Sequence, residues 1–248
     1  MPPVENASQG SGASRTSPAS SLIVRSLGRI PYDLAWEAMQ AFNERRGADS
    51  ADELWLLEHP SVFTLGRAAS PKHLLAPGDI PVIRSDRGGQ TTWHGPGQLI
   101  AYLLCDLRRA GLGVRRLVES LEQAVIDMLE SLSIRAMRRP RAPGVYVEGS
   151  KIAAVGLRVS SDCTSHGVAI NVDADLEPFS RIDPCGYPDL SVTRLADFGV
   201  DWSVDETGRH FSRFLAANLG RVIRQGAAEL PRPSRSLSSP SPIRSSMD

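Results

Sequence analysis

Lys151 and Cys185 are the two residues whose types and sequence surroundings could together support covalent chemistry. Lysine occurs only at positions 72 and 151, and the other non-histidine basic side chains are arginines. Lys151 begins the apolar run KIAAVGL, and its amine can give up a proton where a guanidinium cannot. A proton-transferring amine and a solvated residue beside a Gly149-Ser150 turn are both open interpretations of Lys151, and taken alone this residue favours the solvated position.

Cys185 lies between Pro184 and Gly186, where a turn is expected. Loops held by a rigid scaffold often carry nucleophiles, and a thiol near an amine can pass it a proton and attack as the thiolate. Cys105, in the apolar run LIAYLLCDL, instead has the setting of a small buried hydrophobe. A nucleophile and an unreactive loop thiol are both open interpretations of Cys185, and the neighbouring Lys151 and histidines favour the first.

The segment RGGQTTWHGPGQL, residues 87–99, is the second informative stretch. Gly88 and Gly89 would let a ligand approach the backbone closely. The segment has neither the spacing of a Walker phosphate loop nor that of a dinucleotide fingerprint. His94 precedes a stiff Gly-Pro-Gly turn, and it is either a residue of the site or a hydrogen-bonded structural histidine.

Four segments in this order resemble the signature of the lipoyl/octanoyl transferases: RGGQTTWHGPGQL (87–99), GSKIAAVGLRV (149–159), HGVAINVDADLEPF (166–179) and DPCG (183–186). The resemblance covers about residues 22–223. It implies transfer of an octanoyl group from octanoyl-acyl carrier protein to a lysine of a lipoyl domain, the first step of endogenous protein lipoylation. The acceptors it implies are the lipoyl domains of 2-oxoacid dehydrogenase E2 subunits and the glycine cleavage H protein. No cofactor and no metal are implied.

The resemblance also assigns residues. Cys185 matches the family cysteine that carries the acyl group as a thioester, and Lys151 matches the lysine that lowers the pKa of that thiol and shuttles its proton. The positions that match the acyl-binding residues are Arg87, Gly88, Gly89, Gln90, Thr91, Thr92, Trp93, His94, Ala154, Val155, Gly156, His166, Gly167, Val168 and Ala169.

Two positions depart from the family pattern. Residues 161–165 stand where the family usually carries a basic residue and a glycine, which leaves the conformation of that loop open. Trp93 stands where Tyr or Phe is usual.

The fold implied by the resemblance is an α/β domain, a mixed sheet with flanking helices, like the catalytic domain of biotin and lipoate protein ligases. The alternation of apolar strand and helix patterns agrees with it. We expect strands at 22–27, on both sides of His59-Pro60 within 53–67, at 81–85, 98–107 and 167–173, and a hairpin over 145–160. Helices are expected from Pro31 to Arg46, over 114–133 and over 201–223.

The composition sets the remaining expectations. The chain has 248 residues and a formal net charge of +0, which gives no electrostatic footprint for nucleic acid or an acidic membrane. Three cysteines and the lack of a secretory or membrane-spanning pattern favour a soluble, cytoplasmic protein. Residues 1–20 and 226–248, rich in Ser and Pro, are expected to be disordered tails around a catalytic domain at 21–225.

Three other functions compete with this one. An ATP-dependent lipoate or biotin ligase would share the fold but needs no nucleophilic cysteine. A non-enzymatic binding protein would make Cys185 incidental. A metal site of His94, His166 and Cys163 or Cys185 is the third, although their spacing is not that of a zinc cluster.

Overall fold

The computed structural model describes residues 20–140, 142–183 and 190–231. Its strands are β1 Ser21–Arg29, β2 Asp52–Glu58, β3 Val62–Leu65, β4 Val82–Arg84, β5 Thr91–His94, β6 Gln98–Leu104, β7 Met137–Arg139, β8 Ala142–Val147, β9 Ser150–Ser160, β10 Cys163–Asn171 and β11 Val222–Gln225. Its α-helices are α1 Tyr32–Arg45, α2 Leu107–Ala110, α3 Val114–Ser131 and α4 Val204–Asn218, with short 3-10 turns η2 Pro71–His73, η3 Glu177–Arg181 and η5 Leu195–Phe198.

Eight strands form one mixed sheet, in the order β11-β1-β2-β6-β10-β9-β8-β7. β1 runs parallel to both β11 and β2, and the remaining neighbours are antiparallel. The strands β4, β3 and β5 form a separate three-stranded sheet. This is the mixed α/β architecture expected from the sequence.

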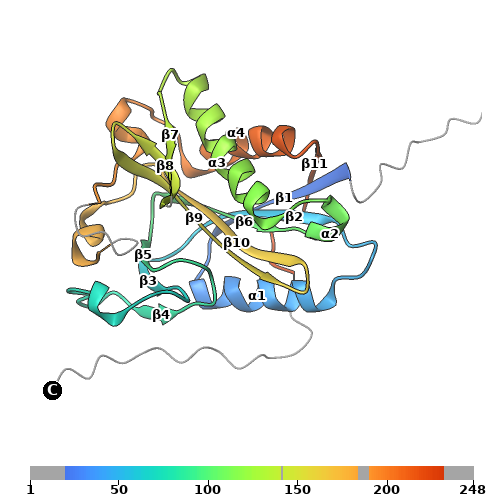
Figure 1. The fold of residues 1–248 in the computed structure, drawn as a ribbon, viewed down its shortest axis with the longest axis horizontal. Helices are drawn as coiled ribbons and strands as arrows, with labels where there is room; N and C mark the ends of the chain where they lie inside the picture. Colours follow the sequence, from blue (N-terminus) through green and yellow to red (C-terminus); the bar gives the residue numbers. More distant parts are fainter. Residues whose placement is uncertain (1–19, 141, 184–189, 232–248) are drawn as a thin grey trace, which may run out of the picture.

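Helices cover both faces of the large sheet (Figure 1). The apolar stripe of α3, including Leu117, Leu121 and Val125, is fully buried and joins α4 in one core on one face. α1 covers the opposite face with Ala35, Ala38 and other small or flexible apolar side chains. Burial of the amphipathic faces of α1, α3 and α4 thus holds the central strands in place.

His59 and Pro60 separate two strands, as expected, and these strands belong to different sheets. β2 lies in the large sheet and β3 in the small one. Proline has no N–H to continue a strand ladder, so the chain leaves the large sheet at this point. The small sheet packs its own core of Phe63, Trp93 and Phe179.

The C-terminal helix is shorter than the sequence predicts. Ser203 caps α4 by accepting a hydrogen bond from the N–H of Glu206, but the helix ends at Asn218. Gly220 adopts a left-handed φ of 62°, which stops the helix. The following residues form β11 along β1, so Val222 is 58% exposed instead of facing the core.

Three other boundaries differ in detail. The strand expected over 98–107 ends at Leu104, because Asp106 caps α2. The two-residue hairpin turn is Glu148-Gly149, both with positive φ, one position before the turn expected from the sequence. In the expected C-terminal tail, the N–H of Gly226 still donates to the carbonyl of Val24. Residues 1–19 and 232–248 lie outside the described residues.

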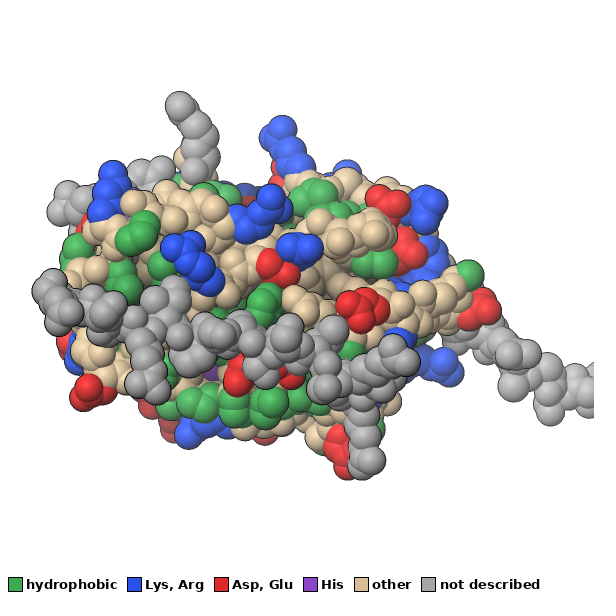
Figure 2. Space-filling model, turned by 90° about the horizontal axis from the view of Figure 1, so that it is seen from below, with side chains coloured by type: hydrophobic (Ala, Val, Ile, Leu, Met, Phe, Trp, Pro, Cys, Tyr) green, Lys and Arg blue, Asp and Glu red, His purple; other side chains and the backbone are tan. Residues whose placement is uncertain are grey.

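The surface agrees with the zero net charge. On the face shown in Figure 2, acidic and basic side chains both occur and neither sign fills the visible face. None of the helices in the described ranges is long and apolar enough to cross a membrane.

Candidate functional site

The pairing of β9 with β10 brings two predicted segments together. Gly156 lies opposite Gly167 and Ala154 lies opposite Ala169. A Cβ on Gly167 would stand 2.0 Å from the carbonyl oxygen of Ala101 on β6, so only glycine lets β10 approach that strand. The two small-residue segments therefore form one thin sheet surface on which a ligand can lie.

A mostly apolar pocket lies over this surface. Thirteen of the fifteen positions expected to bind the acyl group line it. Four lining residues were not expected from the sequence: Tyr32, Ile100, Tyr102 and Pro143. The hydroxyl of Tyr102 within the apolar run LIAYLLCDL is a signal that could have identified one of them.

The two remaining positions lie elsewhere. Gly88 donates its N–H to the carbonyl of Leu157 at 2.8 Å and lines a groove that adjoins the pocket. Trp93 is buried in the core of the small sheet, where its ring packs on Phe179 and its indole N–H donates to Ser61. The indole therefore anchors β5 in the core of the small sheet.

Arg87 organises the glycine loop. Its buried guanidinium donates to the carbonyl and the hydroxyl of Thr64 and to the carbonyls of Gly88 and Gln90. Because several donors of one rigid group reach both β3 and the loop, the loop is held in a single shape beside the pocket.

Three histidines and two tyrosines form a buried cluster at the pocket, and all of them except His59 line it. The ring of Tyr32 stacks on those of His94 and His166 and meets that of His59 edge-on, at centroid distances of 6.3, 6.5 and 5.2 Å. His59 faces the carbonyl of Ile30 at 2.6 Å, so its Nδ1 carries the proton and its Nε2 accepts from the hydroxyl of Tyr102 at 2.7 Å. Burial lowers the pKa of His59 to about 4, and His59 is therefore neutral at neutral pH.

His94 is hydrogen-bonded within the same region. Its Nδ1 donates to the amide oxygen of Gln98 at 2.7 Å, because the Gln98 amide nitrogen is directed at the side-chain oxygen of Asn171. Asn171 in turn donates to the carbonyl of Thr193. Burial holds the pKa of His94 well below its usual range. The neutral ring therefore lies at the pocket wall and is connected to the segment around Thr193.

His166 lies on the wall and pairs with a carboxylate. Its Nε2 donates to Asp86 at 2.7 Å, and Asp86 also accepts from the indole of Trp36 and lies 3.3 Å from the guanidinium of Arg158. Burial lowers the pKa of His166 although Asp86 opposes that shift. Backbone φ at His166 is +63°, an unusual value for a residue with a side chain, and the ring stacks on that of Tyr32 at the start of α1.

Lys151 is 4% exposed, so the solvated hairpin position considered as an alternative is wrong. Its Nζ donates to the carbonyl of Pro143 at 3.2 Å and lies 5.3 Å from the ring centre of Tyr146. Lys151 lines two cavities that each share walls with the acyl pocket. It therefore lies between these two cavities and beside the acyl pocket.

Cys185 lies outside the described residues, but the chain on both sides of it is described. Asp183 donates its backbone N–H to the carbonyl of His73, and its carboxylate pairs with the His73 ring at 3.1 Å. His73 is thus mostly buried and paired. On the other side, the backbone of Lys151 donates to Ser191 and accepts from Thr193.

The other two cysteines lie away from the pocket. Burial, with the nearby Asp52, raises the pKa of Cys105 to about 12, and burial raises the pKa of Cys163. Neither lines the pocket over β9 and β10. Across the ranges that the structure describes, no group of three or more His, Cys, Asp or Glu residues could hold a metal ion.

Comparison with known proteins adds to this geometry. The family model of the lipoyl protein ligase A/B catalytic domain matches residues 31–216. The octanoyltransferase of Thiobacillus denitrificans is 60% identical over 195 residues, which cover 79% of this chain and 89% of that protein.

Solved structures share the fold. A bipartite lipoate protein ligase of Thermoplasma acidophilum, studied with its E2 lipoyl domain, has a TM-score of 0.69 at 17% identity and covers 84% of this chain and 87% of its own. Biotin protein ligase of Aquifex aeolicus, in complex with biotin and ATP, has a TM-score of 0.50 at 17% identity, over 80% and 70% of the two chains. The expected fold is thereby confirmed.

Proposed function

This chain belongs to the lipoyl protein ligase A/B catalytic-domain family and, within it, to the octanoyltransferases; from this premise, we propose that it transfers an octanoyl group from octanoyl-acyl carrier protein to a lysine of a lipoyl domain through a thioester on Cys185. Lipoyl domains of 2-oxoacid dehydrogenase E2 subunits and the glycine cleavage H protein are the proposed acceptors. Both half-reactions need one thiol and one amine able to change its protonation state.

In the first half-reaction, the thiolate of Cys185 attacks the carbonyl carbon of the donor thioester. The new carbon–sulfur bond forms as the bond to the donor sulfur breaks, and the ammonium of Lys151 gives its proton to the departing donor thiolate. One thioester replaces another, so the step needs no ATP. The products are the free donor thiol, the acyl-cysteine and a neutral Lys151.

In the second half-reaction, the neutral amine of the acceptor lysine attacks the acyl-cysteine. Lys151 takes a proton from the attacking nitrogen, and the sulfur of Cys185 leaves as a thiolate. An amide forms, and the thiolate and ammonium of the starting enzyme are restored. An arginine at position 151 could not perform this exchange, because a guanidinium does not lose its proton in proteins.

The pocket over β9 and β10 supports an aliphatic substrate. Ala154, Val168 and Ala169 present small apolar surfaces there, and Ile100 extends them from β6. Burial of methylene groups contributes about 0.8 kcal/mol each, so an eight-carbon chain can gain several kcal/mol from such a surface.

The position of Lys151 is the observation that carries the proposal. Lys151 is buried and lines both cavities that share walls with the acyl pocket. Its backbone also pairs with residues 191–193, which follow shortly after Cys185 in the chain. Both features support a Lys151 amine that exchanges protons with the thiol of Cys185 and with substrates bound beside it.

Intact-mass measurement tests the thioester. We expect the protein to gain the mass of one octanoyl group when octanoyl-acyl carrier protein is added without ATP, and hydroxylamine should remove it. Cys185→Ser should prevent the adduct, whereas the matched variant Cys163→Ser should retain it. A hydroxylamine-stable adduct, or loss of the adduct in Cys163→Ser, contradicts the assignment. A parallel reaction with octanoic acid and ATP in place of the carrier protein tests the alternative, because acylation under those conditions alone would indicate an ATP-dependent ligase.

The acceptor is tested with the same donor. Adding an isolated lipoyl domain to the acylated protein should move the octanoyl group to one lysine of that domain, and hydroxylamine should not release it because the product is an amide. A domain whose acceptor lysine is replaced by Arg should leave the acyl group on the enzyme.

A further inference from the structure

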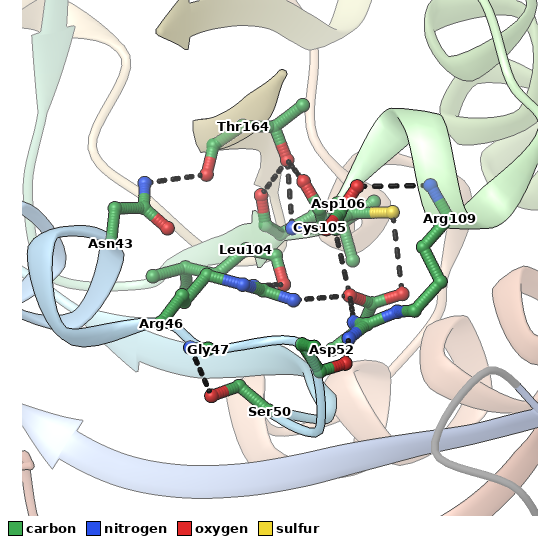
Figure 3. A network of polar contacts seen from close by, with 12 residues as sticks. Asn43, Arg46, Gly47, Ser50, Asp52, Leu104, Cys105, Asp106, Arg109 and Thr164 are labelled. Atoms are coloured by element: carbon green, nitrogen blue, oxygen red, sulfur yellow. Dashed lines mark hydrogen bonds and ion pairs between the residues drawn. The ribbon is translucent and has the colours of Figure 1, made fainter. Parts of the chain in front are cut away.

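A second polar centre lies around the buried carboxylate of Asp52 at the start of β2, away from the acyl pocket. One oxygen of Asp52 accepts from the guanidinium groups of Arg46 at 2.5 Å and Arg109 at 2.6 Å. The other oxygen lies 3.3 Å from the guanidinium of Arg221. Figure 3 shows Arg46, Arg109 and Cys105 arranged around this carboxylate. Three guanidinium groups thus share one buried carboxylate.

The nearby acidic groups do not balance these charges. Asp106 is the second carboxylate of the region, and it caps α2 by accepting from the N–H of Arg109. A further guanidinium, that of Arg116, lines the same pocket as Arg109 and Arg221. With Arg46 behind it, the region holds four guanidinium groups and three carboxylates, the third being that of Asp127, which accepts from Asn218 of the pocket wall at 2.9 Å, so it has an excess of about one positive charge.

A pocket opens beside this centre. Its walls come from the ends of α2 and α4 and from one side of α3, and they include Arg109, Arg116, Ser120, Asn218 and Arg221. It shares no lining residue with the acyl pocket or with the two cavities around Lys151. The pocket is therefore a separate feature of the molecule.

Two guanidinium nitrogens at this pocket have no hydrogen-bond partner in the described part of the chain. They are the buried Nε of Arg109 and one terminal nitrogen of Arg221, whose side chain is only 7% exposed. A buried donor without an acceptor costs free energy, and native structures rarely leave one in that state. The carbonyls of residues 215–217 near the end of α4 are engaged by the N–H groups of residues 219–221. Both unpaired nitrogens are buried, so a ligand reaches them only with a shift of these two side chains, and the pocket surface itself offers excess positive charge.

We propose that this pocket binds a compact oxyanion of the phosphate type, supplied as inorganic phosphate or as the phosphoryl end of a nucleotide. A tetrahedral oxyanion has several acceptor oxygens, and planar guanidinium groups match them with paired hydrogen bonds. The arginines at 109, 116 and 221 come from three separate parts of the chain and line this one pocket. This site is independent of the octanoyl transfer proposed above.

Calorimetric titration of the full-length protein at low salt tests the site, with inorganic phosphate and AMP as separate ligands. We expect one binding site per chain for both, and weaker binding as sodium chloride is raised. Similar affinities for the two ligands indicate recognition of the phosphoryl group alone, and tighter binding of AMP indicates a nucleotide.

Neighbouring arginines on α3 provide a matched pair of variants. Arg116→Gln should weaken binding about tenfold, the effect of one charged hydrogen bond. Arg115→Gln removes the same charge from a side chain that is 94% exposed and pairs with Glu119, so it should leave the affinity unchanged. Equal weakening by both variants, or no saturable binding by the unaltered protein, overturns the proposal.

Arg221→Gln should also weaken binding, but it removes the ion pair with Asp52, so its thermal unfolding must be shown to be unchanged. A third variant leaves the buried ion pairs intact. Ser120→Asp places a carboxylate in the pocket without touching that network and should abolish binding. Undiminished phosphate affinity in Ser120→Asp overturns the proposal.

Discussion

The backbone N–H of Thr193 donates to the carbonyl of Lys151 at 3.0 Å, and the N–H of Lys151 donates to Ser191 at 2.8 Å. The start of β9 is therefore hydrogen-bonded to the chain that follows Cys185. These bonds involve only the backbone, so a change of the Lys151 side chain does not remove them. A variant at Lys151 can thus report on the amine itself.

Lys151→Arg keeps a positive charge but should lower the rate of octanoyl transfer by about 100-fold or more, because proton transfer by a positioned side chain contributes about 10²- to 10⁴-fold. Lys72→Arg is the matched control, since Lys72 is the only other lysine and lies in the exposed turn η2. The measurement is the rate of lipoyl-domain octanoylation, with thermal unfolding checked for both variants. Near-normal turnover of Lys151→Arg means that Lys151 acts only through its charge.

The three cysteines should differ in reactivity. Burial raises the pKa of Cys105 to about 12, so about one thiol in ten thousand is ionised there at pH 8. Limited iodoacetamide at pH 8, read by peptide mass, should label Cys185 first, Cys163 more slowly and Cys105 only after unfolding. Faster labelling of Cys163 than of Cys185 contradicts the choice of nucleophile.

Much of the pocket was readable from the sequence because its walls are local segments. Residues 154–156 and 167–169 stand on one hairpin, and both segments belong to the family signature from which the acyl-binding positions were predicted. The position of Lys151 was not readable in the same way. Its burial depends on residues 191–193, which pair with it across 40 positions of the chain, and no periodicity encodes such a contact.

Gly167→Ala should strongly destabilise the protein, because the new Cβ would stand 2.0 Å from the backbone oxygen of Ala101 and the two central strands would have to separate. We expect a loss of several kcal/mol in the free energy of unfolding, beyond the about 1–3 kcal/mol usual for overpacking. Gly47→Ala is the control, since nothing lies within 4 Å of a Cβ there. Urea denaturation measures both, and equal stability of the two variants contradicts this packing argument.

The histidine and tyrosine cluster was only partly foreseen. His94 and His166 were expected at the site, whereas His59 was expected only at a break between two strands and Tyr32 was not expected there. His59 comes from the end of β2 and Tyr32 from the start of α1, and their rings meet edge-on. Side-chain contacts between separate elements depend on the packing of α1 on the sheet, which a single sequence does not specify.

This cluster predicts how stability depends on pH. The pKa of His59 is about 4 in the folded protein and about 6.5 when unfolded, so the unfolded chain binds a proton first as the pH falls. The contribution of neutral His59 is fully present above pH 6.5 and is lost between pH 6.5 and 4, by roughly 3 kcal/mol. The lowered pKa values of His94 and His166 act in the same direction.

His59→Gln isolates this effect, because glutamine can donate to the carbonyl of Ile30 and accept from the hydroxyl of Tyr102 but does not titrate. We expect the free energy of unfolding of His59→Gln, measured in urea, to change less between pH 6.5 and 4 than that of the unaltered protein. His210→Gln is the control, since His210 stacks on Trp202 outside the cluster. If His59→Gln keeps the full pH dependence while His210→Gln reduces it, His59 is not the buried group that opposes protonation.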